Sequence, residues 1–240
     1  MTSFKRIGME KKLQLEWLGR VVALAKDEAD PKLIRADMDR YLLTSLPGSE
    51  SRRKHIDVLM RIWVKVADEN KQLRDEALLL WERVSARERV ALHWGLCLLA
   101  YPIFKDVTAA IGKLLNLQDD VLLSQVHKRI VDSWGERTTL RYAVQRLLRT
   151  LTWWGVLAET GKKGVYRAGD EMDVQDKDGA LWLLHCYIQA SAEETVPLTS
   201  LLAAPALFPF KLNVRLSDLG DSERFEVTRQ GLNSDVVGLR

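Results

Sequence analysis

Residues 138–168 read TTLRYAVQRLLRTLTWWGVLAETGKKGVYRA. Apolar side chains at every third or fourth position from Thr138 to about Trp154 predict an amphipathic helix, with Thr138 as its cap and Gly155 as its stop. Residues 156–159 are strand-like, the run 160–164 has the composition of a hairpin tip, and residues 165–167 are predicted to be the returning strand. The segment therefore predicts a helix followed by a β-hairpin.

Two more helices are predicted upstream of this segment. The spacing of apolar residues predicts one helix over Phe104–Leu115 and another over about Asp119–Trp134, and residues 135–137 form a short turn. The order helix, helix, turn, helix, hairpin is that of a winged helix-turn-helix. We therefore predict such a module over residues 102–169.

The first hundred residues predict a helical bundle, residues 1–101. Helices are expected over about residues 10–29, from Asp30–Pro31 to about Leu42, and over about residues 51–68 and 72–84. The run Ser85–Ala86–Arg87–Glu88 fits a capping box and begins a fifth helix. That helix is apolar nearly all round from Val90 to Ala100, which is typical of a central buried helix, and Tyr101–Pro102 ends it.

The last segment, residues 170–240, predicts an acidic region with two helices and one hairpin. Residues 171–178 are expected to be an acidic linker. Residues 180–192 look helical, residues 197–202 form a shorter helix, and strands are expected over Lys211–Leu216 and Arg224–Thr228 around a loop at 217–221. Leu207, Phe208 and Phe210 could anchor a partner or fill the core. The predicted fold class is thus mainly α: a helical bundle, a winged helix-turn-helix and a small α+β region.

The charge of the chain is distributed unevenly. Apolar residues make up 47% of the sequence and charged residues 29%, values that argue against wholesale disorder. The net charge of +3 conceals nine Lys/Arg against three Asp/Glu in residues 124–167 and six against twelve in residues 168–240. A localised basic block indicates a surface for a polyanion, and the acidic region could be a separate domain or a cover for that surface.

The predicted third helix has the side chains expected of a recognition helix. Arg141, Gln145 and Arg149 follow each other at i, i+4 and i+8 and so form one outward stripe. Arginine and glutamine suit base edges and phosphates in a major groove, and the hairpin tip adds two lysines. The candidate phosphate contacts are Lys128, Arg129, Arg137, Arg141, Arg146, Arg149, Lys162 and Lys163. The candidate base contacts are Thr139, Tyr142 and Gln145.

Two alternatives stand beside DNA binding. Arginine-rich outer helix faces are often only solvated, and winged helices also serve as protein–protein adaptors. Duplex DNA is the expected ligand for this geometry, because nothing in the sequence resembles an RNA-stacking sheet with exposed aromatic residues. The alternative function is a scaffold that uses the winged helix and the acidic C-terminal region to hold protein partners, and a homodimer is compatible with either function.

The sequence carries no recognisable catalytic or cofactor motif. It has no Walker-type phosphate loop, no GxGxxG after a strand, no GxSxG elbow and no HExxH. His93 and Cys97 are spaced i, i+4 on one predicted helix, a spacing that metal ligands can have, but two ligands do not make a site. His55 and His127 lie in charged contexts and are predicted to be surface residues, while Cys97 and Cys186 are predicted to be buried thiols. We expect a non-enzymatic protein without cofactor or metal.

The sequence also predicts a cytoplasmic location. Residues 1–15 contain no apolar core or cleavage pattern of a signal peptide. The longest apolar run, residues 90–104, is interrupted by His93 and Pro102 and is too short to span a bilayer.

The stretch Glu88–Trp94, the Ala100–Tyr101–Pro102 junction and the basic helical module that follows resemble the BrxA family, small proteins encoded in BREX bacteriophage-defence clusters. The resemblance covers residues 30–160 at most and rests on pattern, without a diagnostic motif. It implies an all-helical DNA-binding protein with no catalytic site, an accessory or regulatory factor of bacterial antiviral defence that works with larger protein components. The chain departs from that plan in its wing and in its acidic C-terminal region.

Overall fold

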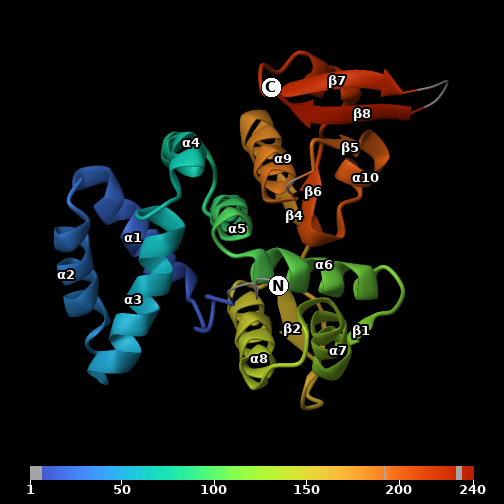
Figure 1. Cartoon of the computed structure of the whole chain (residues 1–240). Helices are drawn as coiled ribbons and strands as arrows, with labels where there is room; N and C mark the ends of the chain where they lie inside the picture. The colour runs from blue at the N-terminus through green and yellow to red at the C-terminus, as the bar shows by residue number, and fades with distance from the viewer. Residues whose placement is uncertain (1–6, 192, 231–233) are drawn as a thin grey trace.

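The structure is a computed structural model, and it describes residues 7–191, 193–230 and 234–240. Within these ranges the chain is mainly helical, with helices α1 to α11 and three small sheets. Figure 1 shows α1 to α4 on one side of the molecule and α5 between them and the remaining elements. The predicted mainly helical class is confirmed.

The first part of the chain is a helical bundle, and two of its predicted boundaries are wrong: the first helix begins at Leu15 and not near residue 10, and the third ends at Trp63 and not near residue 68. Its elements are α1 (Leu15–Asp27), α2 (Pro31–Leu42), α3 (Ser49–Trp63), the 3₁₀ helix η1 (Asp68–Asn70), α4 (Lys71–Arg83) and α5 (Arg89–Ala100). The Asp30 side chain accepts a hydrogen bond from the backbone N–H of Lys32 at 2.8 Å, as the Asp-Pro pair predicts. Ser85 and Glu88 exchange two hydrogen bonds, of 3.0 and 3.3 Å, which confirms the capping box.

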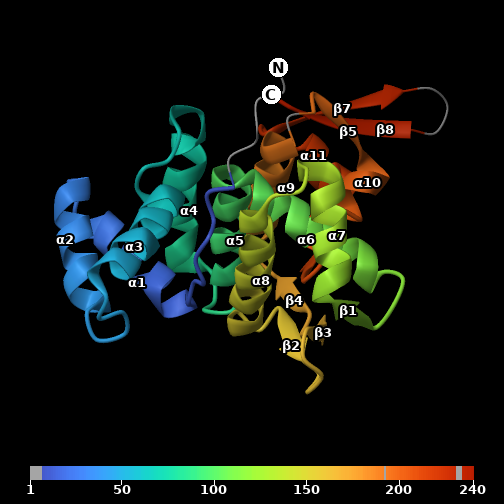
Figure 2. The same ribbon diagram turned by 60° about the horizontal axis from the view of Figure 1, so that its bottom comes forward.

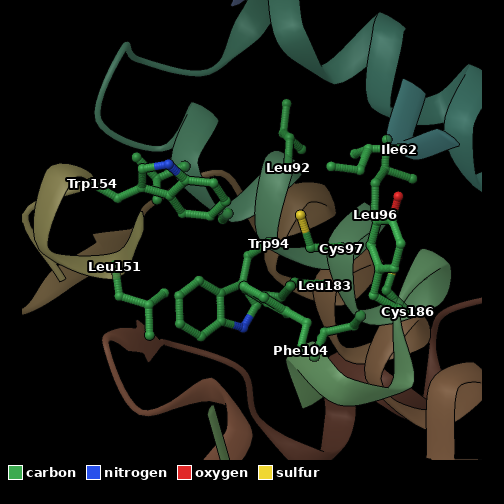
Figure 3. Packing of buried hydrophobic residues seen from close by; sticks show 14 of the residues in the cluster. Ile62, Leu92, Trp94, Leu96, Cys97, Phe104, Leu151, Trp154, Leu183 and Cys186 are labelled. Carbon is green, nitrogen blue, oxygen red and sulfur yellow. The ribbon is translucent and has the colours of Figure 1, made fainter. Parts of the chain in front are cut away.

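Helix α5 is the centre of the core. Every residue from Val90 to Leu98 is buried. The Trp94 ring lies 4.9 Å from that of Phe104 and 5.2 Å from that of Phe210, and its Nε1 donates to a backbone oxygen at residue 206. Figure 3 shows Trp94 and Cys97 among buried side chains from α6, α8 and α9. Phe208 and Phe210 therefore pack against the core, with Phe208 5.8 Å from Trp94.

The buried core is continuous across both predicted domain boundaries, at 101/102 and 169/170. It includes side chains from the bundle, from residues 102–169 and from residues 170–240. Helix α9 (Lys177–Ser191) packs so closely on α5 that a Cβ added at Gly95 would lie 2.5 Å from the Trp182 ring. The three-part division remains a prediction about sequence segments, and in the fold these segments share one apolar interior.

The middle segment folds as a helix, a strand, two helices and a hairpin. Its elements are α6 (Pro102–Leu115), β1 (Asp120–Leu122), α7 (Leu123–Trp134), α8 (Thr138–Trp153), β2 (Leu157–Glu159) and β3 (Val165–Ala168). The strands form an antiparallel sheet in the order β1-β3-β2. The predicted hairpin is confirmed, and Gly155, with φ of +74°, ends α8 as expected.

Two local predictions in this segment are wrong. Helix α7 does not begin at Asp119, because residues 120–122 pair with β3 and the Gln125 side chain accepts the backbone N–H of Leu122 at 3.1 Å. Thr138 does not cap α8. The cap position is Arg137, which makes no side-chain cap hydrogen bond, and Thr138 is the first helical residue.

The C-terminal part surrounds α9 with short strands. Its other elements are β4 (Met172–Val174), β5 (Thr195–Pro197), α10 (Leu198–Leu202), the 3₁₀ helix η2 (Pro205–Leu207), β6 (Phe210–Leu212), α11 (Leu216–Gly220), β7 (Phe225–Gln230) and β8 (Ser234–Leu239). The predicted hairpin between residues 211–216 and 224–228 is wrong: β6 pairs in parallel with β4, α11 intervenes, and β7 pairs with β8. Strand β6 pairs with β4, a strand distant in sequence, and β4 lies inside the segment that was expected to be an acidic linker.

An extended segment, residues 7–14, passes from the bundle to α8. The backbone N–H of Leu13 donates to Thr150 Oγ1 at 3.0 Å, and Trp154 Nε1 donates to the Leu13 carbonyl oxygen at 3.0 Å. Figure 2 shows this segment running beside α8. These two buried hydrogen bonds fix Lys11 and Lys12 next to a helix that lies more than 120 residues away in sequence.

No single helix in the described part of the chain is long and apolar enough to cross a membrane, and the pair α5 and α6, which together have the length, is bent by 119°. Residues 1–6, on which part of the signal-peptide prediction rests, lie outside the described ranges.

Candidate nucleic-acid interface

Helix α8 divides into a buried and an exposed face, as its sequence predicts. Leu140, Val144, Leu147, Leu148 and Leu151 are completely buried. The other face carries mostly polar and cationic side chains, and Tyr142, half exposed at 51%, is the largest aromatic residue near its centre. Because one face of α8 packs in the core, the opposite face is held in place as a ridge of exposed side chains.

A trough of three adjoining hollows runs along this ridge. The first, of about 310 Å³, lies between α8 and the hairpin tip and includes Gln145, Arg149 and Lys162. The second, of about 510 Å³, is lined by Ser124, His127 and Arg141, and it shares the wall residues Leu123, Lys163, Gly164 and Val165 with the first. The third, of about 470 Å³, shares His127 and Arg141 with the second and adds Arg137, Thr138 and Tyr142.

The trough brings together most of the predicted contact residues. Its lining includes Arg137, Arg141, Tyr142, Gln145, Arg149, Lys162 and Lys163. Against these cations stand two carboxylates, Glu136 and Glu159. The excess of positive charge makes the trough suitable for a polyanion.

The carboxylate of Glu159 forms an ion pair with Arg149, one of the predicted contact residues. Arg149 Nη1 donates to Glu159 Oε1 at 2.7 Å, and both side chains are about half exposed. Glu159 ends β2, so the β2–β3 hairpin itself supplies a counter-ion to α8. The sequence stripe could not reveal this pair, because β2 reaches α8 only after the chain has turned at Gly155.

Arg146 and Thr139 lie on the other side of the ridge, toward the bundle. The Arg146 guanidinium stands 5.7 Å from the centre of the Tyr142 ring, and the side chain is half-buried. Thr139 is exposed and lines a further hollow beside the bundle. Lys12 of the extended segment approaches the same side of α8, with its Nζ 5.7 Å from the Trp153 ring. Sequence reasoning missed this bundle side, since no local pattern places residues 7–14 against α8.

Lys128 and Arg129 do not join the trough. Both are exposed on α7, whose buried residues are Val126, Ile130 and Trp134. Their predicted role as phosphate contacts therefore requires a ligand that extends past the trough onto α7.

The buried histidines and cysteines do not form a metal centre. His93 Nδ1 accepts a hydrogen bond from Trp63 Nε1 at 3.1 Å, and burial lowers the pKa of His93 to about 3. Burial also raises the pKa of the Cys97 thiol, which keeps it protonated. Among the described residues no group of three or more His, Cys, Asp or Glu side chains is placed to hold a metal ion.

One histidine prediction is wrong. His55 is buried, because the Trp17 ring packs edge-on against it at 5.6 Å and its Nδ1 lies 2.7 Å from the Ser51 carbonyl oxygen. His127 is half-buried on α7 and lines the trough.

No protein-family model, curated protein or solved structure matches this chain.

Proposed function

We propose that α6 to β3 form a winged helix-turn-helix module and that the protein is a non-enzymatic, duplex-DNA-binding accessory or regulatory factor. The order helix, strand, helix, helix, hairpin and the three-stranded sheet support the module. The observation that carries the function is the cationic trough between the exposed face of α8 and the hairpin tip.

In this proposal α8 enters the major groove and β2–β3 is the wing. Arg141 and Gln145, near the N-terminal half of α8, are placed to reach base edges, which is where recognition helices make such contacts. Lys162 and Lys163, exposed at the hairpin tip, contact the adjacent backbone. Phosphate contacts supply most of the affinity, so binding weakens steeply with salt.

A salt titration on a short random duplex tests the proposal. Fluorescence anisotropy should give a log–log slope near −0.9 for each phosphate neutralised. Arg141→Ala/Arg149→Ala should lower the magnitude of that slope by about one unit, the contribution of Arg141, because Glu159 already neutralises Arg149. The matched control Arg20→Ala/Arg40→Ala removes the same charge from exposed positions of α1 and α2 and should leave the slope unchanged.

Absence of duplex binding by the wild type at low salt would refute the proposal and favour the scaffold function. Equal slopes for both double variants would show that α8 is not the DNA-reading helix.

The resemblance to the BrxA family supports a further part of the proposal, an accessory role beside larger protein components. The exposed carboxylates of residues 170–240, such as Asp170 with its side chain 88% exposed, are the surface that we assign to such partners. Replacing Asp170 and Glu171 by their amides should weaken partner capture and leave the DNA salt slope within about 10%.

A further inference from the structure

A fourth hollow, the bundle hollow, opens on the side of α8 opposite the wing. It has a volume of about 570 Å³ and lies between the extended N-terminal segment, α3 and the start of α8. Four cationic side chains line it: Lys11, Lys54, Arg61 and Arg137. Residues from three distant parts of the sequence thus bring positive charge to one cavity.

The carboxylates of the bundle hollow neutralise only part of this charge. Glu10 and Asp57 line the hollow, but Asp57 is already paired with Arg35 and, at 3.3 Å, with Arg53. Lys54 is paired with Glu50 at 3.0 Å. Lys11 and Arg61 remain against Glu10, with Arg137 at the rim shared with the trough.

Aromatic rings orient the two guanidinium groups. Arg61 lies with its Cζ 5.2 Å from the centre of the Tyr101 ring, and Arg137 lies 5.7 Å from that of Trp134. Stacking on an aromatic face holds a guanidinium in place and leaves its charge intact. Such pre-positioned donors suit the oxygens of a phosphate group.

The lysine of the extended segment lies in a positive environment. Burial is the main cause that lowers the pKa of Lys11; the charges of Arg146 and Lys54 lower it further, and those of Glu10 and Glu50 oppose the shift. Burial also lowers the pKa of His55, against the hydrogen bond at the Ser51 carbonyl oxygen, and the charges of Lys11 and Arg146 add to the lowering. An anion placed among these groups would relieve their mutual repulsion.

The position of the bundle hollow relative to α8 identifies the anion. Arg141 and Gln145 face the wing side, whereas Thr139 and Arg146 face the bundle side. A helix in a major groove about 12 Å wide is flanked by the phosphodiester backbones of both strands. The wing is placed to contact one backbone, and the bundle hollow is placed to contact the other.

We propose that the bundle hollow binds a backbone phosphate of the second strand of the duplex held on α8, through Lys11, Arg61 and Arg137. This inference rests on the proposed function and extends the DNA-binding surface from the winged module to the helical bundle. The extended segment, tied to α8 through Leu13, keeps Lys11 in register with the recognition helix.

The test compares the two sides of α8 in the full-length protein. Lys11→Gln/Arg61→Gln removes charge from the bundle hollow, and Lys162→Gln/Lys163→Gln removes it from the wing. On a random 20-base-pair duplex, the bundle variant should reduce the magnitude of the salt slope by about 0.9, the contribution of one phosphate. Because the electrostatic contribution is small at 1 M salt, this corresponds to about eightfold weaker binding than the wild type at 0.1 M salt. Combining both pairs should reduce the slope by the sum of the separate effects, since the two sites contact different strands of one duplex.

The variant Glu10→Gln is a control that distinguishes an effect of charge from a loss of folding. It removes a carboxylate from the bundle hollow and should strengthen duplex binding, a gain that misfolding cannot produce. Circular dichroism of Lys11→Gln/Arg61→Gln should match the wild type.

Each contrary outcome has a distinct meaning. An unchanged slope in the bundle variants, with a reduced slope in Arg141→Ala/Arg149→Ala, overturns the bundle contact and leaves the DNA proposal standing. A wild type that binds no duplex overturns both. Thermal stabilisation by millimolar inorganic phosphate that disappears in Lys11→Gln/Arg61→Gln, with no change in slope, would identify a free-anion site and overturn the backbone assignment.

Discussion

Glu159→Gln is expected to strengthen DNA binding, although the residue is not among the predicted contacts. The carboxylate holds Arg149 Nη1 at 2.7 Å and so neutralises one cation of the α8 face. Glutamine keeps a similar shape and a hydrogen-bond acceptor but no charge. Arg149 then becomes available to a phosphate, and a negative charge that repels the duplex is removed.

The size of the effect follows from the geometry of the ion pair. The Arg149 and Glu159 side chains are 40% and 52% exposed, so the pair contributes at most about 1 kcal/mol to folding and its loss leaves the fold intact. One additional phosphate contact steepens the log–log salt slope by about 0.9. Because the electrostatic contribution is small at 1 M salt, the variant and the wild type should bind alike there. The steeper slope then gives the variant about eightfold tighter binding than the wild type at 0.1 M salt.

Anisotropy titrations at several salt concentrations measure both the slope and the affinity. Glu82→Gln is the matched control, because it also breaks an ion pair, with Lys26, and adds one unit of charge. Neither residue of that pair lines the trough, and a distant charge is largely screened at 0.1 M salt, so the control should change affinity less than twofold. If Glu159→Gln binds no more tightly than Glu82→Gln, Arg149 is not at the DNA interface and the assignment of α8 is wrong.

Three further changes test packing and titration. Gly112→Ala should lower the free energy of unfolding by about 1–3 kcal/mol in urea denaturation, because its Cβ would lie 2.0 Å from a backbone oxygen of η2, whereas Gly220→Ala meets nothing within 4 Å and should change little. Thr150→Val should lower the free energy of unfolding by about 1–2 kcal/mol, because the N–H of Leu13 loses its buried acceptor. It should also speed hydrogen exchange at Leu13, and unchanged exchange would contradict the anchoring of the extended segment to α8. The pKa of His93 is about 3 in the folded state and near 6.5 when unfolded, so the unfolded chain takes up the proton first and stability falls as the pH drops below about 6.5, by about 1.4 kcal/mol per unit. His93→Gln should not show this pH-dependent loss of stability. Curves of unfolding free energy against pH that run parallel for the variant and the wild type would contradict the assignment to His93.

The regular helices could be predicted because their evidence is local. Apolar spacing of three and four residues defines α8, and a cap such as Asp30 needs only the two residues that follow it. The hairpin β2–β3 is also local, since its tip supplies glycines at residues 161 and 164 with φ near +79° and +76°. In these cases propensity and tertiary structure agree.

The errors occur where a distant partner decides the local structure. Residues 120–122 have the periodicity of the following helix, yet β3 pairs with them in a sheet, for example Asp120 with Arg167, 47 residues away. The parallel pair β4–β6 joins segments that sequence alone assigned to a linker and a hairpin. Long-range pairing of this kind overrides intrinsic propensity, and no window of a single sequence contains it.

The bundle hollow shows the same limit for the site. The predicted contacts came from the most basic segment, residues 124–167, whereas Lys11 and Arg61 lie in segments of mixed charge. Two hydrogen bonds at Leu13 bring the first of them to α8. A charge count along the chain cannot detect a cationic cluster that only folding assembles.

The acidic C-terminal region can be assigned a role in the charge distribution from its contacts. Two predictions were open, a cover for the basic block or a separate domain. In the described ranges its carboxylates pair with the bundle, Asp176 with Arg83 at 2.8 Å and Asp170 with Arg87 at 3.6 Å, and the cations that line the trough take no part in these pairs. Covering the trough would require these pairs to break, whereas leaving them intact keeps negative charge on residues 170–240 and positive charge along α8. That separation argues against a cover, although the region shares the core with the rest of the chain and is not set apart as a domain. It would orient an approaching polyanion toward α8 before any contact forms.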